Sequence, residues 1–271
     1  TGYVTVDGTI LRTKDKVHTD QIINIDASIM ATTTLQPQEI ALNVVYEDQD
    51  IIVINKPVGL VVHPGAGCAD STLLNALLYH YPELSNIPRA GIIHRLDKDT
   101  SGLLVITRNL ISHTKLVSDL QKRQIKREYV AIVNGVVTTG GTIKAPIGRH
   151  PTKRTLMAVK EGGRPSTTHY RVLERFSAHT YLKVILETGR THQIRVHLTH
   201  IGYPIVGDPT YGKRIRMPKK CSDTLRKTLE NFKHQALHAQ RLELKHPSAG
   251  KTMEWEVEPP EDMKKLLQAF L

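Results

Sequence analysis

Strand-like segments joined by short connections dominate the second half of the chain. Each segment is rich in β-branched, aromatic or leucine residues. Because a parallel pair needs a long crossover, short connections favour antiparallel neighbours. The pattern therefore predicts an α+β protein with a central, largely antiparallel mixed sheet. The predicted strands span residues 51–57, 128–133, 142–147, 167–173, 181–186, 237–244 and 253–257.

Three segments have the pattern of helices that flank this sheet. Residues 71–80 place their leucines on one face of a helix. Residues 109–124 begin with Asn109, a residue type that caps helix N-termini. Residues 259–271 begin with prolines and acids and have one apolar side, which predicts a docked C-terminal helix.

The charge of the chain restricts its partner. Lys and Arg number 37 against 26 Asp and Glu, which gives a formal net charge of +11. Such an excess favours a polyanionic partner, either nucleic acid or an anionic membrane surface. No apolar run of spanning length and no signal-peptide pattern occur, so we expect a soluble cytoplasmic protein that binds nucleic acid. Cys68 and Cys221 lack zinc-site spacing and are expected to be free thiols.

One segment, residues 91–102, places a carboxylate among cationic neighbours between two apolar runs. It reads Gly-Ile-Ile-His-Arg-Leu-Asp-Lys-Asp-Thr-Ser-Gly. Arg95 and Lys98 would hold Asp97 ionised, which suits a nucleophile or a base. A surface ion pair is the ordinary alternative for an aspartate in a basic protein. The strand-like runs on both sides favour a position within the sheet instead.

A second segment, the strand at 128–133, places Tyr129 on the same face as Arg127. A tyrosine ring on the face of a site can stack on a nucleic-acid base, and its hydroxyl can relay a proton. A half-buried structural tyrosine is the alternative. Tyr129 is therefore a candidate site residue.

A third segment, around residues 188–202, predicts a helix capped by Thr191. Arg195 lies beside the apolar stripe of this helix, where it can pair with a buried carboxylate or a phosphate. Arg190 lies at the preceding turn and is expected to contact phosphate or to clamp the turn.

In their order along the chain, the segments around Asp97, Tyr129 and Arg195, together with Asn55-Lys56-Pro57, resemble the RluA-type pseudouridine synthases. The resemblance runs from about residue 37 to residue 271. It implies the pseudouridine synthase fold with an active-site cleft. It also implies that Asp97 is the catalytic residue, that Tyr129 sits against the target base and that Arg195 pairs with the aspartate. No cofactor is expected, because isomerising uridine involves no redox change.

Finer features resemble synthases that modify the helix 69 stem-loop of 23S rRNA. They lie at residues 62–67, 149–154 and 207–212. The family resemblance also implies base flipping, with Arg95 filling the space that the base leaves. We expect a monomer whose partner is 23S rRNA or a large-subunit precursor. The further predicted RNA contacts are Arg190, Lys56, His63, Lys153 and Arg154.

Residues 1–36 are predicted to be separate from the catalytic domain at 37–271. Alternation around Asp7-Gly8 indicates a hairpin, residues 22–25 form a short strand, and a polar linker follows from residue 26. This opening resembles the trailing strands of an S4 RNA-binding module, and an arm packed on the main domain is the alternative. The chain begins with Thr rather than Met, so we expect a piece of a longer or processed protein.

Other functional classes remain as alternatives. A ribosome-assembly factor that binds RNA without catalysis shares the charge, but it has no need of Asp97, Tyr129 and Arg195 together. A related synthase that acts on another rRNA or tRNA site shares the motifs. A metal site is not expected, because the histidines lack a His-Glu-x-x-His pattern or a third ligand motif. These histidines are His192, His197, His200, His234 and His238.

Overall fold

The computed structural model divides into two compact units, residues 1–36 and residues 37–271. In the smaller unit, β1 (Val4–Val6) pairs antiparallel with β2 (Ile23–Ile25). Asp7 and Gly8 form the turn of the predicted hairpin, across which Val6 and Thr9 pair antiparallel with two backbone hydrogen bonds of 2.9 Å, and β2 pairs with β1 as a further strand. The structure describes residues 4–11, 15–25, 36–65, 67–153, 155–212, 215–219 and 221–271. Most of the predicted linker lies outside these residues.

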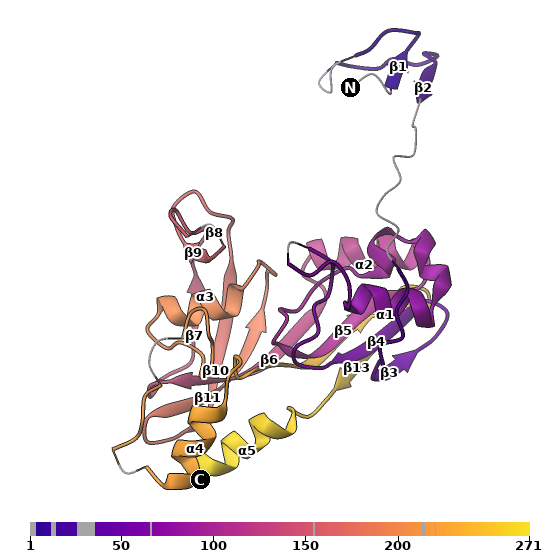
Figure 1. The fold of residues 1–271 in the computed structure, drawn as a ribbon. Coiled ribbons are helices and arrows are strands. Elements are labelled where there is room, and N and C mark those ends of the chain that lie inside the picture. Colours follow the sequence, from indigo (N-terminus) through magenta and orange to yellow (C-terminus); the bar gives the residue numbers. More distant parts are fainter. Residues whose placement is uncertain are drawn as a thin grey trace. The chain divides into compact units, whose positions relative to one another are not determined.

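The larger unit is built on one mixed sheet (Figure 1). Its strands follow the order β3–β4–β5–β12–β6–β11–β10–β7, and β13 pairs with part of β12. The β5–β12 pair is parallel and the other described pairs in this sheet are antiparallel. The predicted α+β class with a largely antiparallel sheet is confirmed. The strands are β3 (Val44–Glu47), β4 (Ile51–Lys56), β5 (Ser101–Thr107), β6 (Lys126–Asn134), β7 (Gly141–Lys144), β10 (Thr167–Arg175), β11 (His179–Leu186), β12 (Leu237–Lys245) and β13 (Thr252–Glu256).

The predicted strand at 142–147 is divided in two. β7 ends at Lys144, and β8 (Ile147–Arg149) begins after Pro146, which lacks the N–H that a continuous ladder needs. β8 pairs with β9 (Met157–Val159) in a separate two-stranded hairpin. Figure 1 shows this hairpin projecting away from the main sheet.

Two helices of the larger unit, at residues 73–80 and 110–121, begin at side chains that cap them. The side chain of Thr72 accepts a hydrogen bond from the N–H of Asn75, and Asn109 accepts one from Ser112. No helix of the described segments combines the length and apolarity needed to cross a bilayer. The helices are α1 (Leu73–His80), α2 (Leu110–Gln121), α3 (Gln193–His200), α4 (Asp223–Asn231) and α5 (Glu261–Phe270), with short 3-10 turns at Pro82–Asn86 and Pro88–Gly91.

The core covers both faces of β4 and β5, and every residue of β5 is buried. Ile52 and Ile54 pack in a cluster with the leucines of α1. Ile51 and Val53 alternate with them and pack with Leu116 of α2. The loop that enters β5 is therefore attached to a rigid, fully buried strand.

Gly102 allows β5 to approach β12 closely. Its φ is +111°, and a Cβ there would lie 2.2 Å from the carbonyl oxygen of Ala239. Only glycine fits this backbone conformation and this contact. The close crossing brings the loop before β5 beside β6, the other neighbour of β12.

Candidate active site

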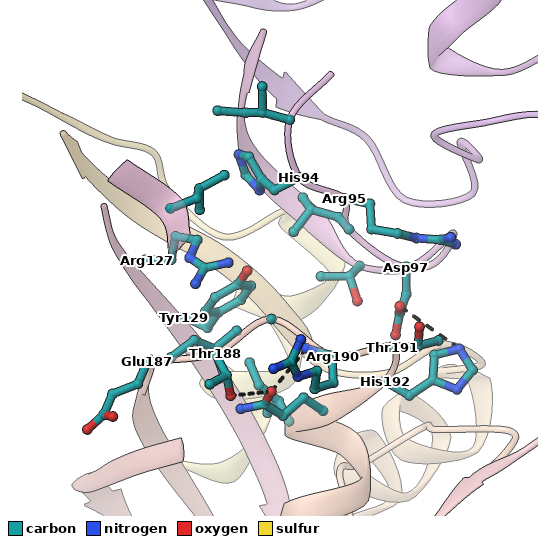
Figure 2. Close-up of a pocket in the computed structure, with 18 of the residues that line it drawn as sticks. His94, Arg95, Asp97, Arg127, Tyr129, Glu187, Thr188, Arg190, Thr191 and His192 are labelled. Carbon is teal, nitrogen blue, oxygen red and sulfur yellow. Dashed lines mark hydrogen bonds and ion pairs between the residues drawn. The ribbon is translucent and has the colours of Figure 1, made fainter. Parts of the chain in front are cut away.

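A cavity of about 510 Å³ lies where the loop 92–97, strand β6 and the segment 186–195 meet (Figure 2). This volume is within the usual range for sites that bind small molecules. Among the predicted site residues, the structure brings Asp97, Tyr129, Arg195, Arg95, Arg190 and His63 into its wall. The wall is rich in cations: Arg89, Arg95, Arg123, Arg127, Arg190 and Arg195 against Asp97 and Glu187.

Lys56 fixes the loop that carries Asp97. Its Nζ donates hydrogen bonds of 2.7, 2.9 and 2.9 Å to the carbonyl oxygens of Pro57, Leu60 and Lys98. The residue is fully buried, and burial lowers the pKa of Lys56 to about 8 although Asp99 and Asp97 oppose this shift. The prediction that Lys56 contacts RNA is therefore wrong, because its three ammonium protons are bonded within the protein.

Arg195 joins Asp97 to a second carboxylate. Its Nη1 donates to Asp97 Oδ2 at 2.9 Å, while Nε and Nη2 donate to Asp208 at 2.7 and 2.9 Å. Burial alone lowers the pKa of Arg195, but the carboxylates outweigh it and raise that pKa. Burial raises the pKa of Asp208, and the hydrogen bonds and charge of Arg195 outweigh this effect, so the net shift is downward. The predicted pair of Arg195 with the aspartate is present in the structure.

Asp208 is the residue of this network that the sequence analysis did not identify. Its side chain is fully buried, and Oδ1 also accepts the backbone N–H groups of Thr210 and Tyr211. The sequence feature that could have identified Asp208 is the segment Gly-Asp-Pro-Thr-Tyr-Gly at residues 207–212. An aspartate before proline in such a turn ordinarily indicates turn chemistry rather than a partner for a distant arginine.

His192 lies beside Asp97, with 4.0 Å between His192 Nε2 and Asp97 Oδ1. The hydroxyl of Tyr211 is 2.8 Å from His192 Nδ1 and accepts the N–H of Met157. This hydroxyl can therefore donate its own proton to Nδ1, which leaves the imidazole proton on Nε2 toward Asp97. Burial lowers the pKa of His192, although the charge of Asp97 opposes the shift.

The start of α3 differs from the prediction. His192, not Thr191, precedes the helix, in a left-handed conformation with φ 56° and without a side-chain cap. The turn is held by Gln193 Oε1, which accepts the N–H of Arg190 and the hydroxyl of Thr188. Thr191 is exposed and has no capping role.

The other side of the cavity is formed by Tyr129, Arg127 and His94 (Figure 2). Tyr129 and Arg127 come from one face of β6, as strand alternation predicted. Burial raises the pKa of Tyr129. Burial and the charge of Arg127 lower the pKa of His94 to about 3, so His94 is neutral and accepts the N–H of Val105 at Nε2.

The remaining predicted RNA contacts differ in position. Burial lowers the pKa of His63 to about 4, with a further contribution from the charges of Arg95 and Arg89, so this wall residue is neutral. Lys153 is exposed in the turn between β8 and β9 and does not line the cavity. Arg154 lies outside the described residues.

A group of side chains with the spacing of metal ligands lies away from the cavity. Within the segments that the structure describes, Asp48, Asp50 and His246 form the one group with suitable spacing. Their polar atoms already bond to one another and to the protein: Asp48 accepts the N–H of Asp50 and of Ile51 and binds His246. This arrangement is that of a structural hydrogen-bond network at the start of β4.

Comparisons with known proteins agree with this geometry. The family model of RNA pseudouridylate synthase matches residues 50–200. The chain belongs to this family. It is 58% identical to ribosomal large subunit pseudouridine synthase D of Pseudomonas aeruginosa, over 98% of this chain and 83% of that protein. It is 53% identical to the protein of that name in Escherichia coli strain K12, over 98% of this chain and 82% of the other.

Solved structures show the same fold. Human RNA pseudouridylate synthase domain containing 1 is 27% identical, with a TM-score of 0.63 over 82% of this chain and 85% of that one. Human RNA pseudouridylate synthase domain containing 4 is 25% identical, with a TM-score of 0.65 over 84% of this chain and 92% of that one. The predicted pseudouridine synthase fold is confirmed.

Proposed function

We propose that this chain isomerises uridine to pseudouridine in 23S rRNA of the large ribosomal subunit, at the helix 69 stem-loop. The observation that carries the proposal is the position of Asp97 in a cationic, nucleotide-sized cavity, with one carboxylate oxygen bonded to Arg195. The printed names of the relatives support the rRNA substrate. The net charge of +11 supplies the attraction to a polyanion.

Asp97 is proposed as the catalytic residue. Arg195 binds Asp97 Oδ2, and Oδ1 is proposed to be the oxygen that faces the substrate. A carboxylate placed at an anomeric carbon can attack C1′ or remove the C2′ proton, as carboxylates do in glycoside-processing enzymes. Arg195 orients the carboxylate, and Asp208 keeps Arg195 in place.

The other cavity residues are proposed to receive the flipped nucleotide. Tyr129 offers its ring to the base, and Arg95, exposed on the loop before Asp97, is proposed to fill the space that the base leaves in the stem. Arg190 and the neutral His63 are proposed to contact the backbone of the flipped segment. Lys153 is proposed to contact phosphate outside the cavity, from the β8–β9 hairpin.

The two units are proposed to have different functions. Residues 37–271 form the catalytic domain, and residues 1–36 belong to an S4-like RNA-binding module. The enzyme is proposed to act as a cytoplasmic monomer without a cofactor, because neither bond breaking nor bond making at C1′ changes the oxidation state.

The test uses unmodified RNA made by transcription. The purified chain is incubated with the helix 69 stem-loop and with a matched stem-loop that has an unrelated uridine-containing loop, and pseudouridine is mapped by chemical derivatisation. We expect conversion in helix 69 alone. Conversion in the unrelated loop alone rejects the helix 69 target. No conversion in any RNA, including complete 23S rRNA, rejects catalysis and leaves an RNA-binding factor.

A further inference from the structure

Arg127 is a buried cation for which the described protein supplies no partner. The residue is 8% exposed and lines the cavity. Its Nε has no hydrogen bond, and no carboxylate of the described segments forms an ion pair with it. Burying a charge without a partner is costly, and buried polar groups are nearly always satisfied. An unpaired guanidinium in a cavity wall therefore indicates that a ligand supplies the partner.

The neighbours of Arg127 carry no negative charge that it binds. Tyr129 is on the same face of β6, and the pKa values of Tyr129 and His94 keep both groups neutral near pH 7. Glu187, the carboxylate of this part of the wall, is bonded to Arg123 at 2.7 Å and to His169 at 2.7 Å. Figure 2 shows Asp97 on the other side of the cavity.

Gly189 leaves room for the guanidinium. A Cβ at this position would lie 2.8 Å from Arg127 Nη1. The turn before α3 therefore allows Arg127 to reach the cavity, and any larger residue at 189 displaces it. The side chain is held by packing rather than by an ion pair, so its donors stay available.

Isomerisation places a negative charge on the base as it leaves the ribose, and a cation at the base would stabilise this charge. When the C1′–N1 bond breaks, its electron pair stays with uracil, and the negative charge spreads over N1, O2 and O4. If Asp97 attacks C1′, a C1′–oxygen bond forms and later breaks as C5 bonds to C1′. If Asp97 removes the C2′ proton, that proton returns to C2′ as C5 bonds to C1′. In both routes C5 then loses its proton, N1 gains one, and the departing base is an anion.

We propose that Arg127 holds the departing uracil. Its guanidinium donates to a carbonyl oxygen at the edge of the ring remote from the ribose and stabilises the negative charge while the ring turns over Tyr129. Arg195 cannot do this, because its Nε, Nη1 and Nη2 are bonded to Asp208 and Asp97. This inference rests on the proposed function and holds for either route of Asp97.

The test compares Arg127→Gln and Arg127→Lys with Lys126→Gln as a matched control. Lys126 is the preceding residue of β6, and its side chain is 62% exposed and paired with Glu243 outside the cavity. We expect Arg127→Gln to lower the single-turnover rate about 10²-fold to 10³-fold, the usual loss for removing one preorganised donor to a developing anion. RNA affinity should stay within about threefold, and Arg127→Lys should recover part of the rate. Lys126→Gln should retain the wild-type rate.

A second substrate separates charge stabilisation from a structural role. In a stem-loop with 6-azauridine at the target, the ring nitrogen stabilises the departing anion while C5–H stays in place. We expect the loss caused by Arg127→Gln to be at least about tenfold smaller for this substrate, and Gly189→Ala to show the same difference. A merely structural role lowers both rates equally.

The possible failures are distinguishable. Equal losses on the two substrates, or an Arg127→Gln rate equal to that of wild type, overturn the inference while the proposed function stands. A wild-type chain that makes no pseudouridine rejects the proposed function, and the inference falls with it.

Discussion

The two sides of the cavity differ in how their charged and polar groups are paired. On one side, Arg195 is bonded to Asp97 and to the fully buried Asp208. On the other side, buried ring or guanidinium nitrogens of Arg127 and His94 have no partner within the protein. Groups that are paired within the protein hold their geometry before the substrate binds, whereas unpaired groups can gain a hydrogen-bond partner only from a ligand. This difference supports the proposal that the aspartate side is preorganised and that the flipped nucleotide supplies the partner of Arg127.

The largest expected effect comes from the paired side. Asp97→Asn removes the reactive charge and keeps the side-chain shape, while Asp208 still holds Arg195. We expect a rate loss of about 10⁴-fold or more with little change in Tm, because removing a catalytic group of this kind typically costs that much. Product formation and thermal unfolding are measured on the same preparation. Activity within tenfold of wild type contradicts the assignment of Asp97.

The stability of the two sides can be compared directly with one variant on each side. Asp208→Ala leaves the buried guanidinium of Arg195 with one carboxylate, and breaking a buried pair costs about 3–5 kcal/mol. Arg127→Gln removes a buried charge that has no ion pair, so it should not lower the free energy of unfolding. Denaturant unfolding of both variants gives the two values. A loss for Arg127→Gln as large as that for Asp208→Ala shows that the two sides do not differ in pairing.

A smaller effect is expected in the dependence of stability on pH. Burial lowers the pKa of His94 to about 3 from the ordinary value near 6.5. Between these two pKa values the unfolded chain binds the proton and the folded chain does not, so this contribution to stability is present above pH 6.5 and is lost as the pH falls toward 3. His94→Gln keeps an acceptor for Val105 but cannot titrate, and it should flatten the loss between pH 6.5 and 4.

The control for this experiment is His200→Gln, because His200 is exposed at the end of α3. We expect its stability to follow that of wild type at each pH. Urea unfolding at several pH values measures the difference. If His94→Gln and wild type lose the same amount of stability as the pH falls, the assignment of His94 as a buried neutral group is wrong.

The resemblance to a known family predicted that Asp97, Tyr129 and Arg195 lie together, whereas the residue patterns alone left a surface ion pair for Asp97 and a half-buried structural position for Tyr129 as alternatives. Asp97 lies in a turn between apolar runs, Tyr129 on a strand face and Arg195 beside a helix stripe, and these patterns fix direction as well as element type. The β5–β12 crossing that brings them together depends on Gly102, whose role is visible only in three dimensions. Their chemical roles remain predictions.

Three features were beyond sequence reasoning for different physical reasons. Asp208 is a loop residue whose partner is set by tertiary contact. Lys56 is bonded to three carbonyl oxygens from two loops. The positions of backbone carbonyl groups depend on the fold, so a pattern of side chains in the sequence does not predict them. Thr191 is a residue type that often caps helices, but here His192 precedes the helix in the left-handed conformation. The side chain of Gln193 holds the turn by accepting the N–H of Arg190.

The smallest expected effect concerns the turn that joins the two sides, since Gly189 lies against Arg127 and His192 lies beside Asp97. Thr191→Ala should change the free energy of unfolding by no more than about 0.5 kcal/mol, as is usual for exposed positions. Gln193→Ala should cost about 1–3 kcal/mol, because four neighbouring groups each lose a hydrogen bond to this buried amide.

Both variants of the turn are measured by denaturant unfolding and by single-turnover kinetics. Since Gln193 holds the turn on which His192 and Gly189 are placed, its loss should also slow catalysis, whereas Thr191→Ala should retain the wild-type rate. If Thr191→Ala loses as much stability as Gln193→Ala, Thr191 does cap the helix, as the sequence predicted. In that case Gln193 does not by itself fix the geometry of both sides of the cavity.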